Sequence, residues 1–470
     1  MKQKKLLLLL GITALLFSSC DIFFSLLDDP GSQSGDPGNQ PLGTRDFWAQ
    51  NATTYSFYSL RAELLHEGKY CTVWAEKGSG VSGSTAHSMA NAYDNDIYPK
   101  MMNTFGTRFS NGMDTMQAAD LIFGDEDGKL CILLLDIRDG YSPQSSSVYV
   151  GGYFSYLNNY ENVPSDSIRR YSNGCDMIYV DTYPGKPGST ESNSTLAHEM
   201  QHLMNFVTGM MLNGRPMDLW INEGLSSAAE WVYAGHPVDK RDHFNRDPSG
   251  LIGRGNNFFV WDNYTSNPNA IYDDYSTVYL FFQWLRLQAS RSIYQDIITS
   301  SNYDYRAVTG AADAAMPGNG YNTWGTLLKT WLLANYVNSA DGPYGYMNDS
   351  TLKTIRAKTA PAGAKSISLA PGEGVFSVTN SEPALTNQGP NIRNAFVNKN
   401  TGMVSDRVMF MGGAMLTYNI NSNTSGSAEN GIITGVASVE AVPRGVLDQP
   451  PVSAPYPISI TEMLRRNGFE

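Results

Sequence analysis

The stretch STLAHEMQHLMNF, residues 194–206, decides the fold of the central part of this chain. Its apolar residues recur at the spacing of an amphipathic helix. The apolar stripe that would hold this helix against a core consists of Leu196, Met200, Leu203 and Val207. We expect Ser194 or Thr195 to cap the start of the helix. The sequence therefore predicts a buried helix, and the polar residues between the apolar ones require a reason to be there.

His198, Glu199 and His202 form an H-E-x-x-H pattern on this helix. Residues four positions apart lie on one helical face, so the two imidazoles can reach one ion while Glu199 projects beside it. Zinc suits imidazole nitrogens, and a catalytic zinc has three protein ligands and one position open to water. Two histidines can also fall at this spacing by chance on a packed helix, but the whole chain contains only 6 histidines. We therefore expect His198 and His202 to bind one catalytic Zn²⁺.

The segment LWINEGLSSAAEW, residues 219–231, predicts a second helix that can supply a third metal ligand. Glu223, inside an Asn-Glu-Gly motif, is the expected ligand. Glu230, further along the same helix, is the rival. A carboxylate near the start of a helix also stabilises the helix dipole, which is the alternative explanation of Glu223.

Together the two motifs resemble those of the gluzincin metallopeptidases, in which the Glu of Asn-Glu-Gly is the third zinc ligand. The wider context resembles the hyicolysin family of bacterial metallopeptidases through five segments in order: VYVGGYFSYLN, SNGCDMIYVDTYP, LAHEMQHLMNF, WINEGLSSAAEW and DDYSTVYLFFQWL. The likeness covers residues 69–290. It implies a zincin-like fold, a ligand role for Glu223 and an orienting role for Glu230.

Peptide hydrolysis is the chemistry that this constellation predicts. A bound zinc lowers the pKa of its water, and Glu199 can act as the general base and then pass the proton to the leaving amine. In the enzymes that the motifs resemble, a downstream Tyr or His stabilises the oxyanion. Tyr275 stands at that place, with Tyr279 one turn later as the alternative, and either can equally be a packing residue. We expect His236 and His243 to be surface or loop residues.

The motifs favour an endopeptidase that acts on peptide or protein substrates. Aminopeptidases with the Asn-Glu-Gly motif carry a G-x-M-E-N segment upstream, and none precedes His198; the similar GGAMLTYN at residues 412–419 comes later and contains no Glu. A non-catalytic, adhesin-like cell-surface protein that retains a zinc site is the alternative. Glu199 favours the enzyme, since it would have no role in simply holding the metal.

The N-terminus predicts export. Lysines precede an apolar run at residues 6–17, which is too short to span a bilayer but has the length of a signal-peptide core. The LFSSC that follows resembles the lipobox of bacterial lipoproteins, which implies a signal peptide over residues 1–19 and lipid attachment at Cys20. An ordinary cleaved signal is the alternative. Residues 28–44 are rich in Gly, Pro, Ser and Asp, so we expect residues 20–44 to form a flexible tether behind the lipid anchor.

A lipid anchor implies a location in the bacterial cell envelope, attached to a membrane. We expect the outer membrane or the cell surface in preference to the inner membrane. Asp21 favours inner-membrane retention under enteric sorting rules, which other bacteria do not share.

Composition narrows the class of protein further. The chain has 470 residues, 41% hydrophobic and 17% charged, which is enough apolar material for large buried cores. Its net charge of −12 gives no support for nucleic-acid binding through phosphate neutralisation. Cys71, Cys131 and Cys175 lie in apolar, strand-like segments, so we expect buried thiols and at most one disulfide.

The order of patterns along the chain predicts an α+β protein, and the resemblance implies that its peptidase portion is zincin-like. Residues 45–190 mix strand and helix patterns, residues 191–340 are helical and carry the zinc motifs, and residues 341–470 predict a β-rich C-terminal domain of unassigned role. The acidic segment GDEDGKL, residues 124–130, invites a calcium interpretation. It lacks the remaining ligands of a calcium-binding loop, and a turn leading into the next strand explains it.

Overall fold

The computed structural model describes residues 41–125, 127–143, 148–235, 238–247, 258–259, 270–290, 292–360, 366–379, 383–410, 412–423, 428–433 and 456–459. All of them belong to one compact unit, Gly38–Glu470. The predicted signal peptide, Cys20, most of the predicted tether and His236 lie outside the described residues. Within them, the protein mixes helices with sheets, as an α+β class requires.

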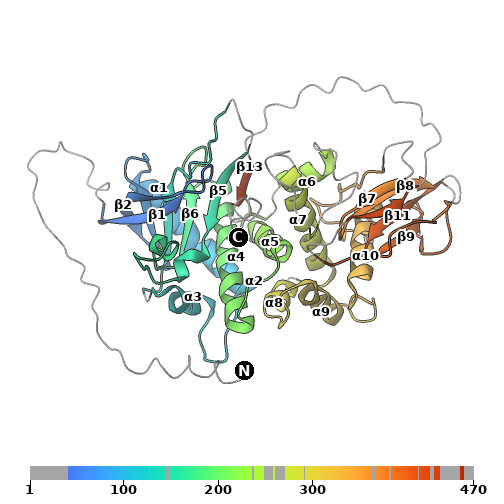
Figure 1. Ribbon diagram of the computed structural model, residues 1–470, viewed down its shortest axis with the longest axis horizontal. Coiled ribbons are helices and arrows are strands. Elements are labelled where there is room, and N and C mark those ends of the chain that lie inside the picture. Colours follow the sequence, from blue (N-terminus) through green and yellow to red (C-terminus); the bar gives the residue numbers. More distant parts are fainter. Residues whose placement is uncertain are drawn as a thin grey trace, which may run out of the picture. The chain divides into compact units, whose positions relative to one another are not determined.

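A seven-stranded mixed sheet dominates the N-terminal half of the chain (Figure 1). In spatial order its strands are β1 (Gly43–Gln50), β2 (Phe57–Glu67), β3 (Cys71–Glu76), β4 (Leu130–Leu135), β6 (Met177–Asp181), β5 (Val148–Phe154) and β13 (Tyr456–Ser459). The first three strands pair antiparallel, whereas β3, β4 and β6 run parallel. Strand β5 is antiparallel to β6 and parallel to β13. Because β1 begins at Gly43, the predicted tether overlaps the first strand.

The parallel strands at the centre are buried along their full length. Every residue of β4 and of β6 is buried, whereas β3 alternates buried and partly exposed residues. Continuous apolar runs such as LCILLL are typical of strands that are covered on both faces. The strands predicted at these segments are confirmed.

Short helices connect the strands of this half: α1 (Gly83–Ala92), the π-helical turn η1 (Tyr93–Ile97), α2 (Tyr98–Phe105), α3 (Thr115–Phe123) and the 3₁₀ turns η2 (Tyr156–Asn159) and η3 (Arg169–Tyr171). Helix α3 has a complete capping box, in which Asp114 accepts from the Gln117 amide and Gln117 accepts in return from the Asp114 amide. After α3 the chain turns at Gly128, which has a φ of 69°. Asp127 accepts from the Lys129 amide there, so the described part of the acidic segment is a turn leading into β4.

The central part is helical, as predicted. It contains α4 (Thr190–Asn213), α5 (Leu219–Ala234), α6 (Val238–Arg246), α7 (Ala270–Gln288), α8 (Ile293–Ile298), α9 (Tyr305–Ala315) and α10 (Trp324–Val337). Four long apolar patterns predict helices here, and they correspond to α4, α5, α7 and α10: STLAHEMQHLMNFVTG (residues 194–209), LWINEGLSSAAEWVYAG (219–235), DYSTVYLFFQWLRLQA (274–289) and WGTLLKTWLLANYV (324–337). Helix α6 escaped prediction because VDKRDHFNR is mostly polar, and α8 and α9 are short.

The start of α4 corrects one expectation. The helix begins at Thr190, and the cap is Ser189, whose hydroxyl accepts from the Ser192 amide at 3.2 Å. Ser194 and Thr195 are therefore not caps. They lie inside the helix, where Thr195 donates its hydroxyl to the Glu191 carbonyl of the preceding turn at 3.2 Å. The predicted apolar stripe is confirmed, since all four of its side chains are fully buried.

The C-terminal part is rich in β-structure. Its strands are β7 (Ser366–Leu369), β8 (Gly374–Thr379), β9 (Ile392–Val397), β10 (Val404–Ser405), β11 (Gly413–Asn419) and β12 (Glu429–Ile432). They form a four-stranded sheet in the order β10-β9-β11-β8 and a two-stranded sheet of β12 with β7. Helix α10 contacts β11, and Tyr336 stacks on Phe376 at 4.3 Å between ring centroids. The last strand of the predicted C-terminal domain, β13, pairs with β5 instead.

Two further expectations concern cysteines and membranes. Cys71, Cys131 and Cys175 are buried and carry free thiols, as predicted. In the part of the chain that the structure describes, no helix combines the length and the apolarity needed to cross a membrane.

Candidate metal centre

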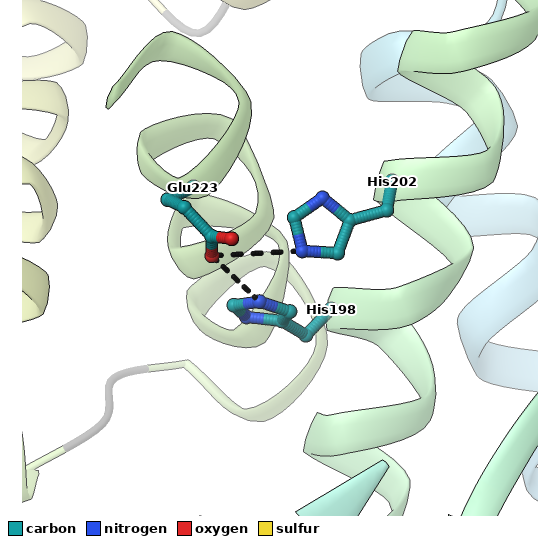
Figure 2. Close-up of side chains that lie close together, drawn as sticks. All are labelled: His198, His202 and Glu223. Carbon is teal, nitrogen blue, oxygen red and sulfur yellow. Dashed lines mark ion pairs between the residues drawn. The ribbon is translucent and has the colours of Figure 1, made fainter. Parts of the chain in front are cut away.

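Helices α4 and α5 pack side by side and bring three predicted ligands together (Figure 2). His198 Nε2 lies 3.4 Å from Glu223 Oε2, and His202 Nε2 lies 3.5 Å from the same oxygen. The two imidazole rings are 4.8 Å apart between centroids. All three side chains are buried, with Glu223 at 0% exposure. The helical spacing of the two histidines and the crossing of the second helix therefore converge on one point.

The ligand atoms lack hydrogen-bond partners. His198 Nε2, His202 Nε2 and both carboxylate oxygens of Glu223 are buried without one. A tetrahedral zinc with ligands at about 2.0–2.1 Å separates adjacent ligand atoms by about 3.3 Å, which agrees with the two measured separations. One candidate atom from each residue lies within 4.8 Å of the others. The donor set and its spacing fit a zinc ion.

The second nitrogen of each histidine has a partner. His198 Nδ1 is 2.7 Å from Glu230 Oε1, a carboxylate that can only accept, so Nδ1 carries the hydrogen. His202 Nδ1 is 3.0 Å from the Ser226 hydroxyl, which donates to Gln201 Oε1 at 2.6 Å and therefore accepts from His202. Both arrangements leave Nε2 with its lone pair for a metal.

The Asn-Glu-Gly motif has a structural explanation for each of its residues. Asn222 accepts from the Asn205 amide of α4 at 2.6 Å, which ties the two helices together beside the ligands. A Cβ on Gly224 would collide with the ring of Phe282, so glycine permits α5 to approach α7 closely. These two contacts fix the position of α5, and with it the position of Glu223 next to the two histidines.

Glu199 lies beside the cluster but is not part of it. It is 1% exposed, and its Oε2 accepts from the Phe154 amide of β5 at 2.9 Å. A Cβ on Gly152 would lie 2.7 Å from Thr195 Cγ2, so glycine permits β5 to approach α4. Burial raises the pKa of Glu199 above its ordinary value, which makes it a better proton acceptor.

The electrostatics of the cluster favour a bound cation. Burial lowers the pKa of His198, but the carboxylates of Glu223 and Glu230 outweigh burial and raise it to about 10. Burial raises the pKa of Glu223, but the charges of His202 and His198 lower it well below its ordinary value. Without a metal, the cluster therefore holds positive charge as protons, and a divalent cation can take their place.

Two predicted tyrosines on α7 differ in their surroundings. The Tyr275 ring lies 6.3 Å from the His198 ring between centroids, whereas Tyr279 packs into the main apolar core. Both are almost fully buried. Tyr275 is therefore the tyrosine that lies beside the candidate ligands.

His243 is not a surface or loop residue, contrary to expectation. It is 1% exposed on α6, and its Nε2 lies 2.7 Å from Asp273 Oδ1 of α7. The expectation failed because its partner is distant in the sequence. Sequence reasoning also missed Ser226, which contacts the ligand His202, and Gln201 and Lys240, which contact the partners of the ligands. No local motif marks such residues, because their contacts form only in the tertiary structure.

A comparison with known proteins finds similarity to a metalloprotease. The chain is 28% identical over 330 residues to the neutral metalloprotease ShpI of Staphylococcus hyicus, and the match covers 67% of each protein. No protein-family model matches the chain. This similarity supports the metallopeptidase class that the motifs predict.

Proposed function

We propose that this protein is a zinc-dependent endopeptidase of the gluzincin type, with a zincin-like arrangement of its peptidase portion. The observation that carries the proposal is the cluster of buried ligand atoms of His198, His202 and Glu223, which face one another at ion-pair distance and have no hydrogen bond. Leaving such atoms without partners is costly unless something binds them. The similarity to a neutral metalloprotease supports the same reaction class.

The residues around the cluster divide the chemistry between them. A zinc ion held by the three ligands would activate a water and polarise the peptide carbonyl. Glu199 takes a proton from the attacking water as the new C–O bond forms, and then delivers that proton to the leaving amine nitrogen as the C–N bond breaks. The Phe154 amide holds one oxygen of Glu199 in place for both transfers.

Tyr275 is the residue that we assign to stabilising the oxyanion. Its ring lies near His198, and a phenol hydroxyl is a suitable donor for the developing negative charge. Tyr275 and Tyr279 both pack in apolar clusters, so the ring contact with His198 is what favours Tyr275.

The N-terminal sequence supports lipid attachment at Cys20 and a place in the bacterial cell envelope. The basic start, the short apolar run and the LFSSC segment are the features that favour it. The absence of a G-x-M-E-N segment before His198 favours internal cleavage over removal of terminal residues.

The test pairs metal analysis with cleavage of an unfolded protein. The wild type should contain one zinc per chain and cleave internal bonds. Glu199→Gln should keep the zinc and lose roughly 10²–10⁴-fold in rate, the usual contribution of a general base. Glu191→Gln, at an exposed position on the same helix, is the matched control and should retain full activity.

Two outcomes would contradict the proposal. A wild type that binds zinc but cleaves nothing would favour the non-catalytic binding protein. A Glu199→Gln variant as active as the wild type would remove the general-base assignment.

A further inference from the structure

Lys240 on α6 is a buried lysine whose charge is turned toward the candidate metal centre. Its side chain is 7% exposed, and its ammonium group contacts Glu230 Oε1 in an ion pair. It also lies 6.0 Å from the centroid of the Tyr275 ring. Removing an ammonium group from water costs free energy unless a close partner compensates. The ion pair with Glu230 is the contact that compensates for burying Lys240.

The same carboxylate oxygen binds the candidate ligand His198. Glu230 Oε1 lies 2.7 Å from His198 Nδ1 and also receives Lys240 Nζ. Three helices, α4, α5 and α6, thus meet at a single oxygen atom. Burial alone would raise the pKa of Glu230, but Lys240 and then His198 lower it below its ordinary value.

The two candidate histidine ligands are supported in different ways. His202 depends on the neutral pair Ser226 and Gln201, both fully buried. His198 depends on the carboxylate of Glu230, whose side chain is 14% exposed. This carboxylate can therefore also turn toward solvent. A charged partner such as Lys240 can keep the Glu230 carboxylate in contact with the His198 imidazole.

We propose that Lys240 is a positioning residue for His198. It holds the Glu230 carboxylate where that group accepts the His198 Nδ1 hydrogen, and so aims His198 Nε2 at the ligand cluster. This inference rests on the proposed zinc site. The competing explanation is that Lys240 only joins α6 to α5, in which case its loss would lower stability and leave metal affinity unchanged.

The experiment measures the zinc affinity of the full chain by competition with a chromophoric chelator. Lys240→Met should weaken zinc binding about 10-fold, the lower end of the effect of losing a hydrogen-bond partner of a zinc ligand. Lys240→Arg, which keeps the charge, should recover part of the affinity. Lys129→Met removes a more exposed lysine–glutamate pair, with Glu67 at 2.5 Å, and should leave the affinity unchanged.

A second background tests whether Lys240 acts through Glu230. In Glu230→Gln, adding Lys240→Met should cause little further loss, because the carboxylate that the lysine holds is gone. Thermal unfolding of each metal-free variant separates a change in stability from a change in affinity. Lys240→Gln, which is smaller and polar, replaces Lys240→Met if the latter does not fold.

The outcomes are distinct. Wild-type zinc affinity in Lys240→Met, or an equal loss in both backgrounds, would overturn the positioning role while leaving the proposed function intact. A wild type that binds no zinc would overturn the proposed function, and this inference with it.

Discussion

The α4–α5 interface and the C-terminal sheets both bury polar side chains, but they treat them in opposite ways. In the C-terminal sheets the buried groups bind one another: Thr417 donates to the Ile432 carbonyl at 2.7 Å, and Asn419 donates to the Leu369 carbonyl at 2.9 Å. Among the described residues from 366 to 433, no buried side-chain polar atom lacks a partner. Between α4 and α5 the metal-facing atoms of His198, His202 and Glu223 have no hydrogen bond and face only one another.

The polar groups of the C-terminal sheets stabilise the fold through their hydrogen bonds. The metal-facing polar groups of the α4–α5 cluster do not, which is typical of a binding site. An unsatisfied buried donor or acceptor costs about 1–3 kcal/mol. What distinguishes the α4–α5 cluster is that its unsatisfied atoms come from three residues and converge on one point. The donor types and their spacing suit a divalent cation.

Removing the carboxylate of a candidate ligand should have the largest effect on zinc affinity. Glu223→Gln keeps the shape of the side chain but removes its charge. Zinc affinity should therefore fall by more than about 100-fold, which exceeds the loss expected from removing a residue that only hydrogen-bonds to a ligand. Metal analysis after dialysis measures the effect. Glu429→Gln, whose carboxylate accepts from both nitrogens of Asn391, is the control and should keep the zinc.

The second largest effect should come from the tyrosine assigned to the oxyanion. Tyr275→Phe removes only the hydroxyl, and kcat should fall about 100-fold with little change in KM, as expected for an oxyanion donor. Tyr279→Phe is the matched control on the same helix. Steady-state kinetics on a defined peptide compares them, and an equal loss in both variants would assign the two hydroxyls to packing.

Zinc affinity should also depend on pH. In the metal-free protein the pKa of His198 is raised from 6.5 to about 10. The stability that this proton contributes is fully present below pH 6.5 and is lost as the pH rises through about 10. Zinc must displace the proton, so its affinity should rise up to about tenfold per pH unit. Chelator competition between pH 6.5 and 8.5 measures this rise, and a flat profile would refute it.

The smallest effect on zinc binding should come from the C-terminal sheets, where the buried polar groups are paired. Thr417→Val in β11 leaves the Ile432 carbonyl and the Asn394 amide without their partner, which should lower the free energy of unfolding by about 1–3 kcal/mol. Zinc affinity should not change. Denaturant unfolding of the zinc-loaded protein gives the first quantity and chelator competition the second. A loss of zinc in this variant would mean that the two regions are not independent.

Much of the central part could be predicted from sequence because its signals are local. Helix α10 matches its predicted range, and the segments of α5 and α7 agree to within a few residues. Strands β1 and β2 were missed because their patterns are weak and they become strands by pairing with each other. Ser189 was missed as a cap because polar residues continue for a turn before the apolar stripe begins.

The sequence by itself determined which atoms can bind a metal, since the spacing of His198 and His202 on one helix follows from local geometry alone. Only the tertiary structure decided that Glu223 meets them, that Glu230 and Lys240 support His198, and that His243 is buried against Asp273. The reason is physical. A helical face is set by residues a few positions apart, whereas the partners of a buried charge come from whichever elements pack against it.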